Sequence, residues 1–314
     1  MKEEKKMVGE KQIMVSVFIL TYNQEKFVAQ TIESILSQKL NFPFQLVIGE
    51  DCSSDNTRAV CEEFVRCHGD QIKLLPSPEK NIGLIANYMR TIKECDGKYI
   101  AICDGDDYWT DPFKLQKQVD FLENNLEYSI VHTALKFLSP NGGFNVFSDS
   151  NQSDYKDFND LIYANFIFSV TALFRNIQFK EPLPQWIDQY PYGDWPTYLW
   201  TLKEGGKIHY IQDVTAVYRK NIGISYKLKD WYTEDLKIRR NILNDTHFKK
   251  YRETVLKCIF EKECGLVLAY NRERKFIKAF KLFSQLFRKE EGKLSLAKLY
   301  LYSLKKALLR NKKE

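Results

Sequence analysis

The sequence predicts an α/β fold built on a parallel sheet, and one local pattern that recurs along the chain indicates it. Each repeat is a short apolar run, then a polar loop, then a stretch with apolar residues at helical spacing. Strands that alternate with helices favour βαβ crossovers and a parallel sheet. Because parallel strands end at the same edge of the sheet, the polar loops are expected to meet there and bind a ligand.

The first two repeats have the same construction. Residues 14–20 form the first predicted strand, and the helix after it places these apolar residues on one face: Phe27, Ile32, Ile35 and Leu36. The second strand, 44–49, runs into the polar loop 50–57, where Ser54 or Asp55 is expected to cap the next helix. The apolar residues of that helix are Val60, Phe64 and Val65.

The third repeat is shorter and leads to a fourth strand. Residues 72–75 form the strand, and a loop at residues 81–84 precedes a helix through Tyr88 and Ile92. The next apolar run, 98–103, is expected to be a buried strand of the same sheet.

Three carboxylates in four residues, Asp104, Asp106 and Asp107, follow the fourth strand. Like charges this close repel one another unless a cation or hydrogen-bond donors compensate them. Carboxylate oxygens are ligands that Mg²⁺ or Mn²⁺ prefers, and such an ion can bridge to the oxygens of a diphosphate. The cluster therefore indicates a metal site. The alternative is a solvated acidic turn, since Asp-Gly pairs are frequent in turns.

Four segments resemble the motifs of one known family in their order and spacing. They are residues 15–24 (VSVFILTYNQ), 49–57 (GEDCSSDNT), 81–87 (NIGLIAN) and 99–115 (YIAICDGDDYWTDPFKL). With them the chain resembles the family 2 glycosyltransferases over residues 13–135, and more weakly to about residue 230. The resemblance implies the GT-A fold, a Rossmann-like nucleotide-diphospho-sugar transferase domain, and a hexosyl- or N-acetylhexosaminyl-transferase activity.

The resemblance also implies roles for individual residues. The residues implied at the donor are Thr21, Tyr22, Glu25, Asp51, Asn81, Asp104 and Gly105. The first three of these would lie near its base and ribose. Asp51 would meet the imide edge of the base, since a uracil N3–H needs an acceptor; an ordinary turn position is the alternative for this residue. Asp104 and Asp106 would hold Mn²⁺ or Mg²⁺, which stabilises the leaving diphosphate as a Lewis acid.

Two further acidic residues belong to the same region. Asp107 is expected either to support the metal site or to cap residues 108–110. Asp111 and Pro112 indicate the start of a helix, with Asp111 at the N-cap and Pro112 at the first helical position. The residues of this helix that are expected in the core are Phe113, Leu115, Val119, Phe121 and Leu122.

An inverting transferase needs a general base that takes the proton of the acceptor hydroxyl. In the family this is an acidic residue before a helix, and residues 192–195 resemble that segment. Asp194 is therefore the candidate catalytic base, and Trp195 is a candidate ring for stacking on the acceptor. The usual acidic residue before the base is replaced here by Gly193. Asp188 is the alternative base, and a helix N-cap is the alternative role for Asp194.

Residues 213–219 are predicted to form a late strand, similar to the family's strand that ends in Tyr-Arg. Many relatives then have a His near a Gly, whereas residues 220–225 contain no His. Arg219 or Lys220 is expected to contact the diphosphate in its place. The alternative is a solvated pair of charges.

Cysteine and histidine usage argues against a structural metal or a disulfide framework. The chain has seven Cys without a C-x-x-C pair and four His without zinc-ligand spacing. Buried thiols in a reducing cytosol are therefore expected. Residues 1–7 lack the apolar core of a signal peptide, and no apolar stretch reaches the length of a membrane span, so a cytoplasmic location is expected.

The net charge of +6 is unevenly distributed along the chain. Residues 251–314 hold 17 Lys and Arg and 7 Asp and Glu, a net charge of +10, and the rest of the chain has a net charge of −4. An acidic body argues against a nucleic-acid partner, because binding would need a basic face.

The basic tail is predicted to be helical over residues 279–287 and 294–309. In the second segment one set of residues recurs at helical spacing: Leu294, Ala297, Leu301, Leu304 and Leu308. Basic residues, Lys298, Lys305 and Lys306, lie elsewhere around this helix. A basic amphipathic helix is typical of a membrane-surface element, which predicts peripheral attachment to the anionic inner face of a membrane. The alternative is a helical hairpin that packs on the catalytic domain.

These observations predict a GT-A domain at residues 13–230 and a helical basic extension at residues 231–314. The expected function is transfer of a sugar, with inversion, from a nucleotide-diphosphate donor such as a UDP-sugar to a hydroxyl of a glycan or lipid-linked acceptor in cell-surface polysaccharide synthesis. Residues 140–191 match no motif and are expected to determine specificity. A sugar nucleotidyltransferase and a nucleotide-sugar-binding pseudoenzyme are the alternatives. The former lacks a Gly-rich basic loop after the first strand, and the latter depends on Asp194.

Overall fold

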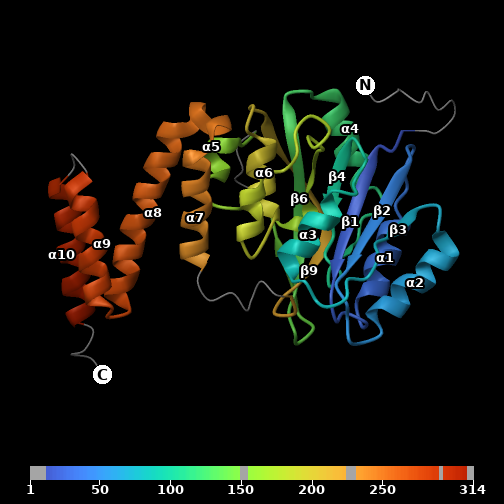
Figure 1. Ribbon diagram of the computed structural model, residues 1–314, viewed down its shortest axis with the longest axis horizontal. Coiled ribbons are helices and arrows are strands. Elements are labelled where there is room, and N and C mark those ends of the chain that lie inside the picture. The colour runs from blue at the N-terminus through green and yellow to red at the C-terminus, as the bar shows by residue number, and fades with distance from the viewer. Residues whose placement is uncertain (1–11, 149–154, 224–230, 290–292, 310–314) are drawn as a thin grey trace. The chain divides into compact units, whose positions relative to one another are not determined.

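The computed structural model describes residues 12–148, 155–223, 231–289 and 293–309. Contacts within the chain divide it into two compact units, residues 1–229 and 230–314. The first unit is a sheet with helices, and the described residues of the second form a set of helices (Figure 1).

The first unit is built around a mixed sheet. Its described strands are β1 (Val15–Thr21), β2 (Phe44–Glu50), β3 (Ile72–Leu74), β4 (Tyr99–Ile102), β5 (Tyr108–Trp109), β6 (Tyr128–Leu138), β7 (Phe144–Phe147), β8 (Leu173–Arg175) and β9 (Lys207–Arg219). They follow the order β3-β2-β1-β4-β8-β6-β9-β5, and β7 pairs with β6. The predicted strands β1 to β4 pair in parallel, as expected, whereas β8 runs antiparallel to both β4 and β6.

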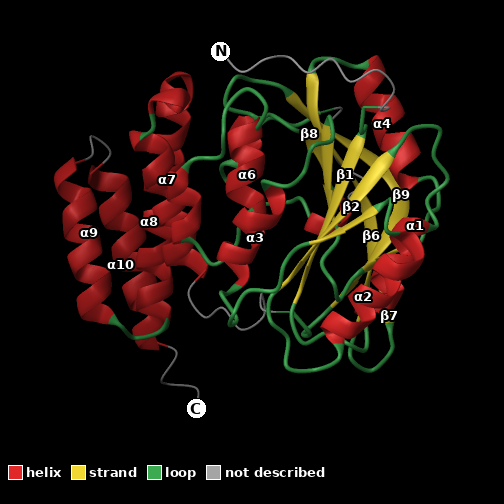
Figure 2. Ribbon diagram, turned by 45° about the vertical axis from the view of Figure 1, so that its right-hand side comes forward, coloured by secondary structure: helices red, strands yellow, loops and turns green. Residues whose placement is uncertain are grey.

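Helices cover both faces of this sheet. They are α1 (Val28–Leu36), α2 (Thr57–His68), α3 (Leu84–Ile92), α4 (Lys114–Asn124), α5 (Phe158–Leu161) and α6 (Asp194–Thr201). Figure 2 shows α3 and α6 on one side of the sheet and α1, α2 and α4 on the other. Burial on both faces explains why β1 is a continuous apolar run rather than an alternating one, since all seven of its residues are buried.

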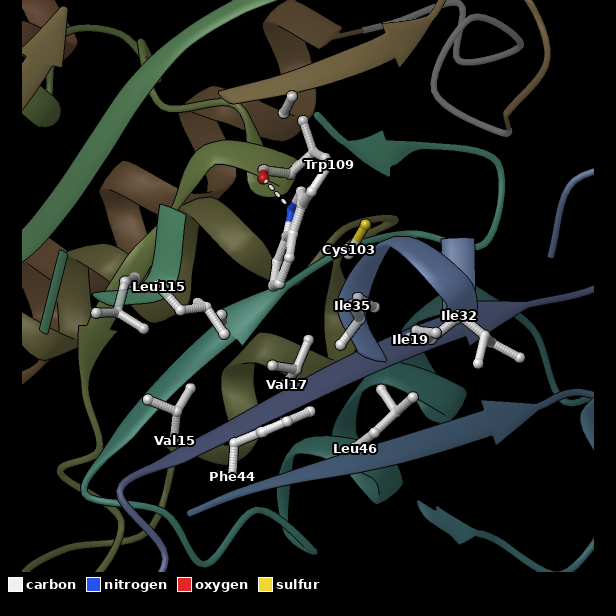
Figure 3. Packing of buried hydrophobic residues seen from close by; sticks show 14 of the residues in the cluster. Val15, Val17, Ile19, Ile32, Ile35, Phe44, Leu46, Cys103, Trp109 and Leu115 are labelled. Carbon is white, nitrogen blue, oxygen red and sulfur yellow. Dashed lines mark hydrogen bonds between the residues drawn. The ribbon is translucent and has the colours of Figure 1, made fainter. Parts of the chain in front are cut away.

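The core side chains alternate between the two faces of β1. On one face, Val17 and Ile19 pack with residues of β2, α1 and α4, and the Trp109 indole closes the group by donating a 2.9 Å hydrogen bond to the Val170 carbonyl (Figure 3). On the other face, the ring of Phe18 lies edge-on to Tyr88 of α3, at a centroid distance of 5.4 Å. The sheet therefore carries one apolar layer on each side.

Two helix starts differ in detail from the prediction. Helix α4 begins at Lys114, because Pro112 and Phe113 form a turn in which the Asp111 carboxylate accepts a 2.8 Å bond from the Phe113 amide. Phe113 is consequently exposed and is not a core residue. Before α2, Asp55 accepts a 2.9 Å bond from the amide of Thr57, the first helical residue, although Asn56 occupies the N-cap position.

The described residues of the second unit are helical. The elements are α7 (Trp231–Asn244), the short 3₁₀ helix η4 (Thr246–Tyr251), α8 (Arg252–Arg272), α9 (Phe276–Lys289) and α10 (Lys293–Leu309). Helices α8, α9 and α10 share a small core of their own, made by Val267, Ala279, Leu286, Leu296 and Tyr300. None of the helices in the described ranges is long and apolar enough to span a membrane.

The predicted stripe of α10 is wrong in phase. Leu301 and Leu308 are exposed, Leu304 packs at the border of the core, and the side chain of Leu294 lies outside the described residues. The buried residues of this helix are instead Leu296, Tyr300 and Ala307. Apolar residues occur on more than one side of α10, so spacing alone did not select the packed face. The ring of Phe283 in α9 selects it by stacking on Tyr300 at 4.4 Å.

Candidate active site

The loops that follow β1 and β2 are tied together at the carboxyl edge of the sheet. The amide of Asn23 donates to Ser53 at 2.9 Å, and the amide of Gln24 donates to Thr57 at 2.7 Å. Glu25, predicted at the donor, accepts 3.0 Å bonds from both the amide and the side chain of Asn56. In the structure Glu25 therefore joins the two loops.

Asp51 organises a third loop at the same edge. Its buried carboxylate accepts three 2.9 Å bonds, from the amides of Ile82 and Gly83 and from the side chain of Asn81. Burial raises the pKa of Asp51, against the backbone hydrogen bonds, which lower it. A carboxylate offers about four acceptor positions, so one remains after these three bonds for a donor such as an imide N–H.

The acidic cluster folds into a tight turn after β4. Asp106 and Asp107 are buried, and the Ser169 hydroxyl donates a 3.0 Å bond to Asp104. Burial raises the pKa of Asp104 to about 7, and the charge of Asp106 adds to the effect. Burial also raises the pKa of Asp106 and Asp107. This turn is thus rich in carboxylates whose charge is poorly compensated.

Arg219 at the end of β9 is the cation that supports the turn. Its guanidinium donates to the Asp106 carbonyl and, at 2.5 Å, to the side chain of Gln30. It lies 4.8 Å from the ring centroids of both Phe27 and Tyr108. The guanidinium is thus bound within the protein, whereas the Lys220 ammonium lies 4.0 Å from the centroid of Phe137.

Asp107 supports the turn from inside the protein. Its carboxylate accepts a 2.8 Å bond from the Arg219 amide, and its carbonyl accepts a 2.6 Å bond from the buried Thr31 hydroxyl. Residues 108–109 form the strand β5, which pairs with β9, so Asp107 does not cap a helical segment. Of its two predicted roles, the supporting role agrees with this geometry.

The environment of Asp104 and Asp106 fits a divalent cation that also binds substrate. No group of three or more His, Cys, Asp or Glu able to hold a metal occurs in the described part of the chain. Mg²⁺, however, is commonly bound by one or two carboxylates together with substrate phosphates. Burial is the main cause of the raised pKa of both carboxyls. A cation bound beside them would stabilise their ionised form.

Near Asp104 and Asp106, two buried polar atoms make no hydrogen bond. They are the buried Thr21 hydroxyl and the Gln24 carbonyl oxygen. A side chain at Gly105 would overlap both of them, with its Cβ 2.8 Å from the Thr21 hydroxyl. Gly105 thus leaves room beside buried polar groups, which is typical of a ligand site. Tyr22 lies next to Thr21 in the chain and is exposed.

Asp194 is the first residue of α6, and Gly193 rather than Asp194 occupies the N-cap position. Burial raises the pKa of Asp194, and its carboxylate accepts a 3.3 Å bond from the Asn165 side chain. The charge of Asp194 contributes to the raised pKa of Asp104, so the two carboxyl groups belong to one electrostatic cluster. Asp188, the alternative base, is exposed on the short helix η2 (Gln185–Gln189).

The proposed stacking role of Trp195 is wrong. Its indole is buried and donates a 3.0 Å bond to the Leu161 carbonyl. Because α6 packs on the sheet, the residue after Asp194 points into the protein. The ring therefore anchors the start of α6 and does not face an acceptor.

Gly193 is explained by Tyr88 of α3. A Cβ at position 193 would overlap carbon atoms of the Tyr88 ring, closer than carbon atoms can approach. The Tyr88 hydroxyl donates a 3.0 Å bond to Thr197 of α6. The ring therefore occupies the space that a side chain before Asp194 would need.

Sequence reasoning missed several residues that hold the site together. They are Gln24, Thr31, Asn165 and Ser169, each contributing a polar side chain to the loops or carboxyls described above. Asn165 and Ser169 lie in the segment without motifs, so no sequence signal pointed to them. Thr31 falls on a helix whose periodicity predicted only a packed face.

The fold and these residues define an α/β domain of the GT-A type with acidic residues at the carboxyl ends of its strands. A family model, Glycosyl transferase family 2, matches residues 16–177, just over half of the chain. The chain therefore belongs to glycosyl transferase family 2.

Known proteins resemble the chain in sequence or in fold. The putative teichuronic acid biosynthesis glycosyltransferase TuaG of Bacillus subtilis is 29% identical over 109 residues, 35% of this chain and 42% of that protein. Crystal structures include S. aureus TarS 1–349 with UDP-GlcNAc (TM-score 0.61, 19% identity, 94% of this chain and 90% of that one). The mannosyltransferase PcManGT of Pyrobaculum calidifontis with GDP-Man and Mn²⁺ has a TM-score of 0.55 at 15% identity, covering 98% and 89%. The chain spans about half the length of the curated relatives that it matches.

Proposed function

We propose that the protein transfers a glycosyl group, with inversion, from a nucleoside-diphosphate sugar to a hydroxyl of a glycan or lipid-linked acceptor in cell-surface polysaccharide synthesis. The observation that carries the proposal is the gathering of Asp51, Asp104, Asp106 and Asp194 around the carboxyl edge of the sheet. Membership of the family supports the reaction class. The name of TuaG supports a polysaccharide product.

The donor is proposed to be a UDP-sugar. Asp51 has one acceptor position left for the N3–H of uracil, and Asn81 lies beside it. Thr21 and Gly105 border the space in which the ribose would lie. The TarS complex with UDP-GlcNAc, a protein of the same fold, supports this choice of nucleotide.

Asp194 is proposed to be the general base. Its carboxylate removes the proton of the acceptor hydroxyl, the hydroxyl oxygen forms a bond to the anomeric carbon, and the bond from that carbon to the diphosphate oxygen breaks. Burial, which raises the pKa of Asp194, strengthens it as a base. Attack on the face opposite the leaving diphosphate inverts the anomeric centre.

Asp104 and Asp106 are proposed to hold Mn²⁺ or Mg²⁺ when the donor binds. A bound divalent ion would supply charge stabilisation to the departing diphosphate. The PcManGT complex with GDP-Man and Mn²⁺ supports this proposal. Arg219 keeps the acidic turn in place from behind and is not assigned a contact with the donor.

The test of the base is Asp194→Asn, which keeps the shape of the side chain but cannot accept the proton. Turnover of a UDP-sugar in the presence of acceptor should fall by roughly 10²–10⁴-fold, while the dissociation constant of UDP should change little. Asp188→Asn, at the exposed competing acid, is the matched control and should keep near-normal turnover. Normal turnover in Asp194→Asn would exclude the residue as the base.

The test of the cation is removal of one carboxylate or of the metal. Asp106→Ala should abolish turnover, because it removes a proposed metal ligand. The variant should still fold, because the change relieves repulsion within a buried acidic turn. Excess EDTA should do the same to the unaltered protein, and added Mn²⁺ should restore its activity. Asp120→Ala, at an exposed acid of α4, is the control. Full activity in EDTA would contradict a metal role.

The two alternative functions give different results in the same assay. A nucleotidyltransferase would form a sugar nucleotide from a sugar phosphate and a nucleoside triphosphate, without using an acceptor. A pseudoenzyme would bind the nucleotide sugar and turn it over neither with nor without an acceptor. Acceptor-dependent release of UDP would exclude both.

A further inference from the structure

Helices α9 and α10 carry only one sign of charge. Together they contain eight Lys or Arg and no Asp or Glu. They are also rich in large apolar residues, several of which are not used in packing. This combination lies far along the chain from every residue of the candidate active site, and nothing in the proposed reaction uses it.

One side of each helix packs into the small core of the second unit. Leu296, Tyr300 and Ala307 on α10, spaced by four and seven residues, face the small core that α10 shares with α8 and α9. On α9, Ala279 and Leu286 do the same. Leu282, Phe283, Phe287 and Leu304 pack at the border of this core, whereas other large apolar residues of the two helices are exposed.

The opposite side of α10 is both apolar and basic. Its exposed fractions are 61% for Leu301, 64% for Tyr302, 57% for Leu308 and 51% for Leu309. The exposed residues Lys298, Lys305 and Lys306 lie among them. These seven residues fall on one side of the helix, and we call them the outer face of α10. The Lys306 ammonium lies 5.7 Å from the centroid of the Tyr302 ring.

The neighbouring helix also exposes large apolar side chains. Phe280 of α9 is 58% exposed, and its ring lies 6.3 Å from that of Tyr300. Ile277, one turn before Phe280, is 87% exposed, more than any other large apolar side chain in the described part of the protein. Figure 1 shows α9 and α10 side by side.

We propose that the outer face of α10, with Ile277 and Phe280, docks on an anionic lipid surface. The Leu, Ile and Phe side chains would enter the acyl boundary, and Tyr302 suits the headgroup level. The long Lys side chains reach the lipid phosphates while their stems cover apolar surface. The absence of acidic residues from both helices means that no carboxylate of α9 or α10 repels the leaflet.

Charge also argues against a second copy of the chain as the occupant. Two copies joined through this surface would bring several Lys together without any Asp or Glu on either helix to pair with them. Lipid phosphates supply the missing charge, and acyl chains supply the apolar partner. The docking goes beyond the proposed reaction, because none of its residues belongs to the candidate active site.

The experiment measures sedimentation of the full chain with phosphatidylcholine vesicles and with mixed phosphatidylcholine and phosphatidylglycerol vesicles. The protein should bind the mixed vesicles, and added salt should weaken the binding. The double variant Lys305→Gln/Lys306→Gln should bind about 25-fold more weakly, since each Lys near such a surface contributes about fivefold, or about 1 kcal/mol. Leu301→Ser/Leu308→Ser should also bind more weakly, and it should keep its dependence on salt.

Lys249→Gln/Lys250→Gln is the matched control. It makes the same change in net charge at two exposed Lys of the same unit, on the 3₁₀ helix η4, and should bind like the unaltered protein. All variants should keep their melting temperature and their turnover with a water-soluble acceptor, so a failure of docking is distinct from a failure of the proposed function.

Three results would overturn the proposal. The first is equal loss of binding in the control and in Lys305→Gln/Lys306→Gln, which would mean that general charge alone acts. The second is equal binding to neutral and anionic vesicles. The third is no binding to either vesicle, together with a dimer in solution that Leu301→Ser/Leu308→Ser converts to a monomer. Loss of folding in the Leu variant would show those residues to be packed, and the Lys variants would still decide the electrostatic part.

Discussion

Gly193 and Tyr88 show how one pair of residues can shape the start of α6. The Tyr88 ring fills the space before Asp194, and its hydroxyl is bonded to Thr197 one turn further along the helix. The ring thus touches α6 at two points on either side of the proposed base. A change at position 193 is expected to move Asp194 itself.

Gly193→Ala should therefore act on catalysis more than on donor binding. The added Cβ overlaps the Tyr88 ring, and overpacking of this kind costs about 1–3 kcal/mol of stability. A displacement of about 1 Å at a catalytic group can lower the rate by about 10²-fold, so kcat should fall strongly with little change in the KM for the donor. Steady-state kinetics and thermal unfolding would measure both effects.

The control for this variant is Gly143→Ala. A Cβ at Gly143 would meet nothing closer than 3.4 Å, so this change should leave both kinetics and stability near normal. Tyr88→Phe keeps the ring and removes only the bond to Thr197, and it should lower kcat less than Gly193→Ala does. Unchanged kcat in Gly193→Ala would mean that Tyr88 does not position Asp194.

The residues of the candidate site divide into those that the sequence predicts and those that it does not. Asp51 and Asp104 come just after strands, and Asp194 begins a helix. Sequence motifs predict residues at such positions, because their distance from the strand or helix is fixed. Ser169 and Asn165 reach Asp104 and Asp194 across long separations in sequence, and no local pattern encodes such pairs. Side-chain hydrogen bonds of this kind depend on the packed fold.

Among the elements, α4 has an unusual start. Lys114, its first residue, is fully buried, and its ammonium lies 4.3 Å from the centroid of the Trp109 ring and 2.9 Å from the Gln118 side chain. A cation at the N-terminus of a helix is opposed by the helix dipole as well as by burial. Burial lowers the pKa of Lys114 to about 7.

This shift makes stability depend on pH in a defined direction. The unfolded chain binds a proton at Lys114 up to pH 10.5, whereas the folded protein releases it near pH 7. Between these values the unfolded state holds more protons, so the free energy of unfolding should rise with pH, by up to about 1.4 kcal/mol per pH unit from this group. Below about pH 7 the full cost of the buried charge is present.

Lys114→Met should remove this contribution while filling nearly the same space. Urea unfolding between pH 7 and 8 should give a slope against pH that is smaller in the variant than in the unaltered protein, and the ionisation of unfolded thiols, which both proteins share, cancels in this comparison. Lys117→Met, at an exposed residue of the same helix, is the control and should leave the slope unchanged. Equal slopes in all three proteins would contradict a neutral buried Lys114.

Element prediction succeeded where one periodicity dominated and failed where several competed. The apolar runs of β1, β2 and β4 have only one reading, and their strands form as expected. Helix α10 has Leu or Tyr on several sides, so its packed face is selected by Phe283 of α9 and not by its own spacing. The antiparallel β8 lies within the segment without motifs, residues 140–191, which gave no pattern from which its pairing could be predicted.

At the scale of the whole molecule, the apolar cores of the two units are made by separate sets of residues. One joins β1, β2, α1 and α4 in residues 1–229, and the other joins α8, α9 and α10 in residues 230–314. Every residue proposed to bind donor, metal or acceptor lies in the first unit. The helices of the second unit supply none of them.

A chain of residues 1–229 should therefore fold and bind donor without the helical unit. Because the core and all proposed donor contacts lie in these residues, UDP with Mn²⁺ should raise the melting temperature of this shorter chain and that of the full protein alike. A ligand that binds only the native state at a hundredfold excess over its dissociation constant adds about 2.7 kcal/mol, which a thermal-shift assay detects. Asp106→Ala in the shorter chain is the control and should abolish the part of the shift that depends on Mn²⁺. An unfolded or aggregated shorter chain would show that the helical unit is needed to complete the core of the first.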